Sequence, residues 1–167
     1  MKGEEKTNVL RLLEKGKVQY VSHNYENTGA VSGMEVATAL GQDPDMAFKT
    51  LVTVGRSGEH YVFMVPVARE LDLKKAAKAV GEKSVEMIKS KELLPLTGYI
   101  HGGCSPIGMK KFFKTTVHYT AADYDTIFFS GGRIGFQIEL GTEDLAKVID
   151  FKLEDIIKED LIQNENF

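Results

Sequence analysis

The chain has 167 residues, of which 43% are hydrophobic and 27% charged, and its formal net charge is −3. This length predicts a single domain over residues 1–167 with a sizeable core, and the acidic balance argues against a freestanding nucleic-acid binder, which is usually basic. The single cysteine excludes an intrachain disulfide, and the polar residues 1–6 and the lack of a long apolar run predict a cytoplasmic protein without a signal peptide or a membrane span.

Helices and a β-hairpin are predicted in the first half of the chain. The helices are amphipathic, each ends at a glycine, and the second opens with the capping box Ser32-Gly33-Met34-Glu35. The hairpin joins two apolar runs through the turn Gly55-Arg56-Ser57-Gly58. In chain order the predicted elements are a helix at 7–15, a strand at 18–22, a polar turn at 26–29, a helix at 32–40, a turn at 43–44, strands at 49–54 and 61–65, and a helix at 73–80 capped by Asp72.

The second half mixes strands and helices without strict alternation. The predicted elements are a strand at 85–87, a short helix at 90–94, a hairpin of strands 126–130 and 133–140 around Gly131-Gly132, a helix from Thr142, and a helical stretch at 153–158. This order favours an α+β domain with a mixed sheet over a doubly wound parallel sheet. Dinucleotide binding and a Walker A site have no support, because the glycines lie between predicted strands and no Walker A sequence occurs.

A glycine-rich loop, Leu96–Lys111, separates two predicted elements in the second half. Gly102 and Gly103 let the backbone approach a ligand closely, and Pro106 favours an extended conformation at Ser105. Such a loop can turn backbone N–H groups toward an anion or a carbonyl oxygen. A plain connector has the same composition, so both interpretations stay open on spacing alone.

Few side chains are obvious candidates for catalysis or metal binding. A structural zinc site needs closely spaced ligands, and the histidines are far apart in the sequence, so we expect no metal and no cofactor. Cys104 lacks an evident base, and a small side chain lining a pocket is a simpler interpretation than a nucleophile. The histidines, which we expect at the surface or in packing roles, are His23, His60, His101 and His118.

Lys49 stands directly before the apolar run Thr50–Val54. A lysine at the start of a strand usually lies at its solvated end. The functional alternative is a cation held at the edge of the sheet over a pocket, where it would suit a phosphate or a carboxylate.

Several motifs of this chain occur in the order found in the YbaK/EbsC family, which the chain resembles from about Thr7 to Lys158. The motifs are Phe48-Lys49-Thr50-Leu51, Leu71-Asp72-Leu73-Lys74-Lys75, Thr97-Gly98-Tyr99, Gly102–Gly108 and Phe129-Ser130-Gly131-Gly132. The freestanding YbaK-type members are Cys-tRNA(Pro) deacylases, similar to the editing domain inserted in many bacterial prolyl-tRNA synthetases. The resemblance implies a mixed sheet, partly curled like a barrel and flanked by helices.

The resemblance also implies a reaction, the trans-editing of mischarged Cys-tRNA(Pro). A proline-sized pocket cannot strongly exclude small amino acids, so a second site clears the error. In the family account the substrate's own thiol attacks the aminoacyl ester, forms a cyclic thiolactone and releases the tRNA. The expected partners are the 3′ end of tRNA(Pro) and prolyl-tRNA synthetase, and no catalytic cysteine, metal or cofactor is needed.

Individual residues receive roles from the same resemblance. Lys49 matches the family's essential lysine, expected to hold the phosphate backbone at the tRNA 3′ end. Tyr25 matches a tyrosine that contacts the substrate, although an ordinary half-buried aromatic is the alternative. Ile134 and Gln137 depart from the pattern, because relatives often carry a basic residue and some carry an aspartate there. The other implied substrate-binding residues are Thr97, Gly98, Gly102, Gly103, Ser105 and Pro106 in one loop and Ser130, Gly131 and Gly132 in another.

Three functions stay open at this point. The first is a deacylase specific for cysteine, and the second is a deacylase for another small amino acid such as alanine, which would have to activate water. The third is a non-enzymatic regulatory or binding protein of the EbsC type. The acidic balance and the lack of a basic recognition helix argue against a DNA reader.

Overall fold

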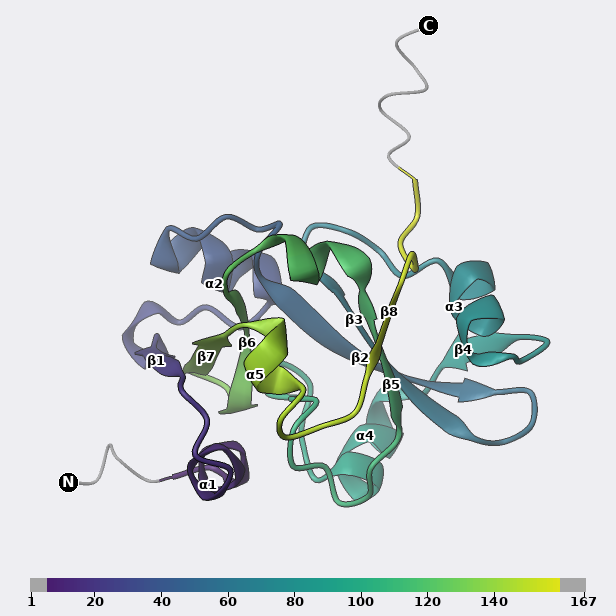
Figure 1. The fold of residues 1–167 in the computed structure, drawn as a ribbon, viewed down its shortest axis with the longest axis horizontal. Helices are drawn as coiled ribbons and strands as arrows, with labels where there is room; N and C mark the ends of the chain where they lie inside the picture. The colour runs from purple at the N-terminus through teal and green to yellow at the C-terminus, as the bar shows by residue number, and fades with distance from the viewer. Residues whose placement is uncertain (1–5, 160–167) are drawn as a thin grey trace, which may run out of the picture.

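Two β-sheets carry the fold, and the computed structural model describes them within residues 6–159. The strands are β1 (Val21–Asn24), β2 (Phe48–Gly55), β3 (His60–Pro66), β4 (Val85–Met87), β5 (Lys114–His118), β6 (Ile127–Arg133), β7 (Phe136–Leu140) and β8 (Lys152–Glu154). The helices are α1 (Asn8–Lys15), α2 (Gly33–Leu40), α3 (Leu73–Val80), α4 (Ser90–Thr97) and α5 (Thr142–Leu145), with 3₁₀ turns η2 (Glu26–Thr28) and η3 (Tyr119–Asp123). One sheet has the order β1-β7-β6 and the other β4-β2-β3-β5-β8 (Figure 1).

The residues predicted to begin α2 and α3 cap these helices as expected. Ser32 accepts a hydrogen bond from the backbone N–H of Glu35, whose carboxylate accepts one from the N–H of Ser32, and this capping box opens α2. Asp72 caps α3 by accepting from two backbone N–H groups. Thr7 caps α1, which packs its apolar face into the core. No helix within residues 6–159 is long and apolar enough to cross a bilayer.

The larger sheet places Lys49 at the beginning of β2, opposite Val65 in the predicted antiparallel β2–β3 hairpin. The next neighbour of β3 is β5, and the two strands are parallel. A parallel pair requires a long crossover connection, and here the crossover contains α3, β4, α4 and the glycine-rich loop. The topology therefore returns that loop to the sheet that carries Lys49.

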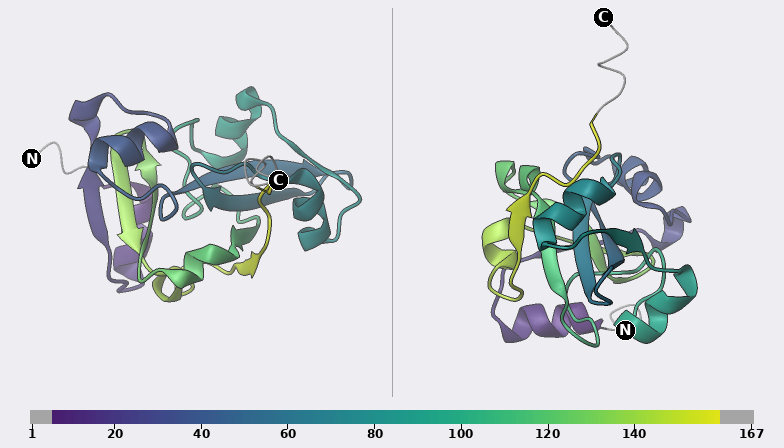
Figure 2. Two further views of the ribbon diagram at one scale, coloured as in Figure 1. Left: turned by 90° about the horizontal axis from the view of Figure 1, so that it is seen from above. Right: turned by 90° about the vertical axis from the view of Figure 1, so that its right-hand side faces the viewer.

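The two sheets meet just before β2. Ala47 forms a parallel bridge with Phe128 of β6, and the Phe128 N–H donates to the Met46 carbonyl at 2.9 Å. The views in Figure 2 show the strands of the two sheets running in different directions around this junction. The α+β class and the mixed, curled arrangement of strands are confirmed, although the strands within residues 6–159 form two sheets and no closed barrel.

The main core lies between the sheets and α1. Its fully buried side chains include Leu13 of α1, Met64 of β3, Phe129 of β6 and Ile138 of β7. A second cluster, around Phe63, fills the opposite face of the larger sheet under α3. Alternate residues of β3 thus serve both cores, which explains why the strand is apolar throughout.

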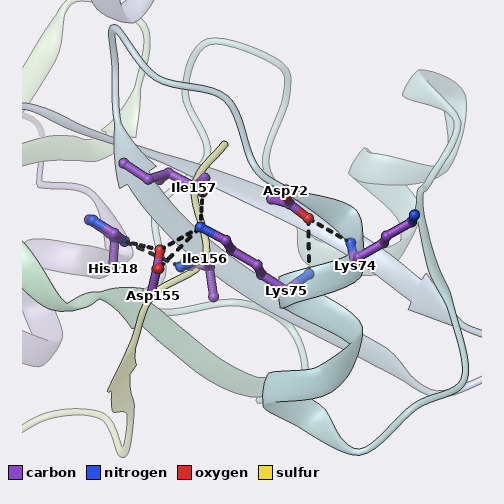
Figure 3. A network of polar contacts seen from close by, with 7 residues as sticks. All are labelled: Asp72, Lys74, Lys75, His118, Asp155, Ile156 and Ile157. Atoms are coloured by element: carbon purple, nitrogen blue, oxygen red, sulfur yellow. Dashed lines mark hydrogen bonds and ion pairs between the residues drawn. The ribbon is translucent and has the colours of Figure 1, made fainter. Parts of the chain in front are cut away.

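A polar network ties the segment after β8 to the rest of the domain (Figure 3). The backbone N–H of Ile156 donates to Nδ1 of the buried His118 at 3.3 Å. Lys75 of α3 pairs with Asp155 at 3.1 Å and donates to the carbonyl of Ile157 at 2.8 Å. The segment directly after β8 is therefore held by β5 and α3 together.

Two of the predicted elements are wrong. Gly131-Gly132 is not the turn of the second hairpin: both residues belong to β6, the β6–β7 register shifts between Ser130 and Arg133, and the turn is Ile134-Gly135. A side chain at Gly131 would collide with the ring of Phe136, so the glycine serves packing instead. The stretch 153–158 is not helical, because Lys152–Glu154 pairs in parallel with β5 as β8.

The ends of two other elements also differ from those predicted. The first strand begins at Val21, later than the predicted 18–22, and the helix that begins at Ser90 continues past Leu94 to Thr97. Strand β5 was not predicted at all. Its pairing partners β3 and β8 are distant in sequence, and such tertiary pairing leaves only a weak local signal in a five-residue strand.

Candidate functional site

A cavity of about 370 Å³ opens where the start of β2, the first turn of α2, β6 and the loop after α4 converge. Most of its wall is apolar, with Phe48, Val67 and Phe129 among the lining side chains. This volume and lining suit a small, largely apolar group, oriented by a few polar atoms.

The cation in this wall is Lys49. Its side chain is half-buried, and within residues 6–159 no hydrogen bond or ion pair occupies its ammonium group. Burial lowers the pKa of Lys49 below its ordinary value, and the negative charge of Glu70 opposes this shift. An anion such as a phosphate would relieve the desolvation of this charge. Lys49 thus lies in the wall of the cavity, and its binding of an anion stays a prediction.

Thr50, the next residue, also lines the cavity. Its Oγ1 is buried and has no hydrogen-bond partner within the described part of the chain. An unsatisfied buried hydroxyl costs free energy. Thr50 thus leaves an unpaired polar atom buried beside the cavity.

The amide of Gln137 is a further polar group in the wall. Gln137 of β7 and Gln42, which follows α2, exchange two hydrogen bonds: Gln42 Nε2 donates to Gln137 Oε1 at 2.7 Å, and Gln137 Nε2 donates to Gln42 Oε1 at 3.0 Å. Only 5% of Gln137 is exposed. Each amide retains one N–H and one lone pair, so Gln137 can still both donate to and accept from a ligand.

Cys104 lines the cavity from the glycine-rich loop. Burial raises the pKa of its thiol to about 12, so the thiol is protonated at neutral pH and is a poor nucleophile. This supports the interpretation of Cys104 as a pocket-lining residue. His101 lines the cavity from an exposed position, and within residues 6–159 no group of three His, Cys, Asp or Glu side chains is arranged to hold a metal ion.

The structure brings together some of the residues expected from the sequence. Tyr25, Lys49, Gly102 and Ser130 all line the cavity, although they come from four separate segments. The other expected residues are not among those that line the cavity: Thr97, Gly98, Gly103, Ser105, Pro106, Gly131 and Gly132. Their contact with a substrate stays a prediction.

Several of these residues outside the lining hold the first loop in shape. The Thr97 hydroxyl donates to the Leu93 carbonyl at 2.8 Å and accepts from the Tyr99 N–H at 3.0 Å. Ser105 is fully buried, and its Oγ accepts from the Ile107 N–H at 3.3 Å. Gly98 ends α4 in the left-handed conformation, which a side chain would strain.

The second glycine pair is anchored to α1 and to its own strand. The hydroxyl of Thr7, the cap of α1, donates to the Gly131 carbonyl at 2.7 Å. The Gly132 N–H donates to Ser130 Oγ at 3.1 Å, which fixes the hydroxyl that lines the cavity. These glycines therefore support the site from outside.

Sequence reasoning missed several lining residues. His101 had no distinguishing local signal, and the pairing of Gln42 with Gln137 joins residues 95 positions apart. Ser32 was identified only as a helix cap, yet it also lines the cavity. The motif around Lys49 could have pointed to Thr50.

Comparison with known proteins places this geometry in a family. The profile of the aminoacyl-tRNA editing domain matches residues 28–148. A candidate Cys-tRNA(Pro)/Cys-tRNA(Cys) deacylase, EbsC, from Enterococcus faecalis (strain ATCC 700802 / V583) is 44% identical over 156 residues, which is 93% of this chain and 95% of the relative.

Solved structures share the fold. A candidate trans-editing enzyme for prolyl tRNA synthetase has a TM-score of 0.79 at 24% identity, covering 91% of this chain and 96% of its own. A hypothetical protein has a TM-score of 0.81 at 19% identity, covering 91% of this chain and all of its own. At these identities the likeness supports the fold alone.

Proposed function

Because the chain belongs to the aminoacyl-tRNA editing domain family, we propose that it is a trans-editing deacylase that clears cysteine from mischarged Cys-tRNA(Pro). The observation that carries the proposal is the half-buried Lys49 in the wall of a small apolar cavity. The cavity has room for a small acyl group, and the lysine can bind the phosphate backbone that carries it. The 44% identical relative, named as a candidate deacylase for the same ester, supports this choice.

In the proposed reaction the cysteinyl group supplies its own nucleophile. Its sulfur attacks the ester carbonyl, the bond from the carbonyl carbon to the ribose oxygen breaks, and the thiol proton passes to that oxygen. The products are a cyclic thiolactone and tRNA with a free ribose hydroxyl. The raised pKa of Cys104 supports this route, since a protonated protein thiol is a poor competitor for the carbonyl.

We expect prolyl-tRNA synthetase to act as a partner that selects the tRNA. The formal net charge of the chain is −3, and an acidic protein attracts the phosphate backbone poorly by itself. In this proposal the cavity recognises the acyl group, and the synthetase recognises the body of the tRNA. A cytoplasmic location follows from such a substrate and partner.

The test is deacylation of Cys-tRNA(Pro), Ala-tRNA(Pro) and Cys-tRNA(Cys) by the purified protein, with and without the synthetase. We expect rapid loss of cysteine from tRNA(Pro), little loss of alanine, and discrimination between the two cysteinyl-tRNAs that increases when the synthetase is present. Faster release of alanine would replace the proposal with an alanine deacylase. No turnover of any of the three would favour a regulatory binding protein.

A further inference from the structure

The charges that line the cavity are unusual for a site that receives an amino acid. Its titratable lining groups are Tyr25, Lys49, His101 and Cys104. Within the described lining, no aspartate or glutamate side chain is present. An α-ammonium group entering this space therefore meets a lysine and no carboxylate.

Three carboxylates close in the chain to lining residues are engaged with other partners. Glu35 accepts hydrogen bonds from backbone N–H groups at the start of α2, and these lower the pKa of its carboxyl. Glu26 pairs with Arg133 at 2.7 Å, and Glu70 pairs with Lys158 at 3.3 Å. None of these three residues lines the cavity.

A neutral amide occupies the buried polar position on β7. Gln137 is fixed by its two hydrogen bonds with Gln42 and keeps one N–H and one lone pair free. An amide can form hydrogen bonds equally well with a neutral amine or with a hydroxyl, since both of these groups can donate and accept. It cannot compensate a buried ammonium as a carboxylate would.

Burial already disfavours positive charge in this wall, because desolvation lowers the pKa of Lys49 more than the negative charge of Glu70 raises it. A second cation in the same cavity would suffer both desolvation and repulsion from Lys49. Loss of its proton is a small step for the α-amine, whose ordinary pKa is about 7.7–8.0. The neutral amine is therefore the form that fits.

We infer that the cavity binds the acyl group with an uncharged α-substituent, so that it takes α-hydroxyacyl esters as well as aminoacyl esters. The inference rests on the proposed function for the place of the acyl group in this cavity. It extends the substrate class from mischarged amino acids to small α-hydroxy acids on the same ribose hydroxyl.

The test compares two ligands that cannot react. They are the L-2-aminobutyryl and L-2-hydroxybutyryl amides of 3′-amino-3′-deoxyadenosine, which resemble the cysteinyl adenosine end without its thiol. Binding to the wild-type protein is measured by calorimetry from pH 6.0 to pH 8.5. The hydroxy ligand has no amine to titrate, so its pH dependence reports the protein's own groups.

We expect both ligands to bind within about threefold of each other at pH 8.5. Below the pKa of the α-amine, the amino ligand should weaken relative to the hydroxy ligand by about tenfold per pH unit. An amino ligand that keeps its relative affinity at pH 6.0 would overturn the inference. Failure of both ligands to bind would also overturn it, whereas the proposed function depends separately on the deacylation assay.

A matched pair of variants tests the role of the neutral amide. Gln137→Glu adds a carboxylate with little change of shape, and it should restore binding of the amino ligand at pH 6.0. Gln137→Met removes both hydrogen bonds with Gln42 without adding charge, and it should keep the wild-type preference. A folded Gln137→Glu protein with the wild-type preference would contradict the inference.

Discussion

Gly103 lies directly against the backbone of Arg133: a Cβ at Gly103 would come within 3.0 Å of Arg133 Cα. The contact joins the glycine-rich loop to the end of β6. Because the neighbouring atoms belong to the backbone, they cannot move aside as a flexible side chain could. The two segments that carry Gly102 and Ser130 to the cavity are therefore held at a fixed separation.

Substitution of Gly103 by valine should push these segments apart. We expect deacylation to fall by about 100-fold in kcat/KM, the effect of a displacement near 1 Å at a site, with a loss of roughly 1–3 kcal/mol in the free energy of unfolding from overpacking. Initial rates and urea unfolding measure the two effects. A variant with the wild-type rate would show that the loop is only a connector.

The matched control for this experiment is Gly58→Ala. Gly58 has a φ of +93° in the β2–β3 turn, open space around it, and no place in the cavity lining. A side chain there should cost about 1–2 kcal/mol of stability and leave kcat/KM unchanged. Comparison of the two variants separates the effect of lower stability on the rate from the effect of a displaced loop.

The Cys104 thiol should be dispensable for catalysis. Since burial raises its pKa to about 12, almost none of it is thiolate at neutral pH, and Cys104→Ala should retain most of the deacylation activity. If the mutant were inactive and the wild-type protein formed an acyl-enzyme that could be trapped, Cys104 would be the nucleophile instead.

Exchange of the substrate side chain tests the other thiol. Seryl-tRNA(Pro) differs from cysteinyl-tRNA(Pro) by a single atom, and a hydroxyl is a far weaker nucleophile than a partly ionised thiol. We expect much slower release of serine from the same tRNA. Equal rates would exclude cyclisation by the substrate as the rate-determining route.

His118 should make stability depend on pH. Burial lowers its pKa below the ordinary 6.5, and its Nδ1 accepts a hydrogen bond from Ile156 that a proton would break (Figure 3). The stabilising contribution of neutral His118 is full above about pH 6.5. It is lost as the pH falls from there through the lower, folded-state pKa.

Urea unfolding between pH 7.5 and pH 5.0 measures this contribution. One proton corresponds to a slope of up to about 1.4 kcal/mol per pH unit. The charges of Asp155, Lys75 and Arg69 also affect the size of the pKa shift of His118. The comparison is therefore with His118→Gln, in which the slope should be smaller. An unchanged slope would assign the pH dependence to other groups.

Local signals predicted much of the fold. The capping box of Ser32 and Glu35, the Asp72 cap and the hairpin around residues 55–58 depend on neighbouring residues, and all three form as expected. Strands β5 and β8 depend on parallel pairing with distant segments. Short strands of that kind have little local signature, and the sequence wrongly predicts a helical stretch where β8 forms.

The site likewise has parts with a local sequence signal and parts that depend on contacts between distant segments. The motif around Lys49 and the loop containing Gly102 predicted two of its walls, and the structure places both on one cavity. The hydrogen bonds between Gln42 and Gln137 could not be predicted, because they require α2 and β7 to meet. The unsatisfied Thr50 hydroxyl is visible only once its surroundings are known.

The most direct test of the account is the initial rate of Cys-tRNA(Pro) deacylation by the wild-type protein, Lys49→Ala, and the control Lys78→Ala, in which an exposed lysine of α3 is removed. Loss of a charge-assisted contact to phosphate costs about 1.5–3 kcal/mol. The account therefore predicts a rate roughly ten- to hundred-fold lower for Lys49→Ala, with the fold intact and the Lys78→Ala rate unchanged. A folded Lys49→Ala protein that deacylates as fast as wild type would contradict it.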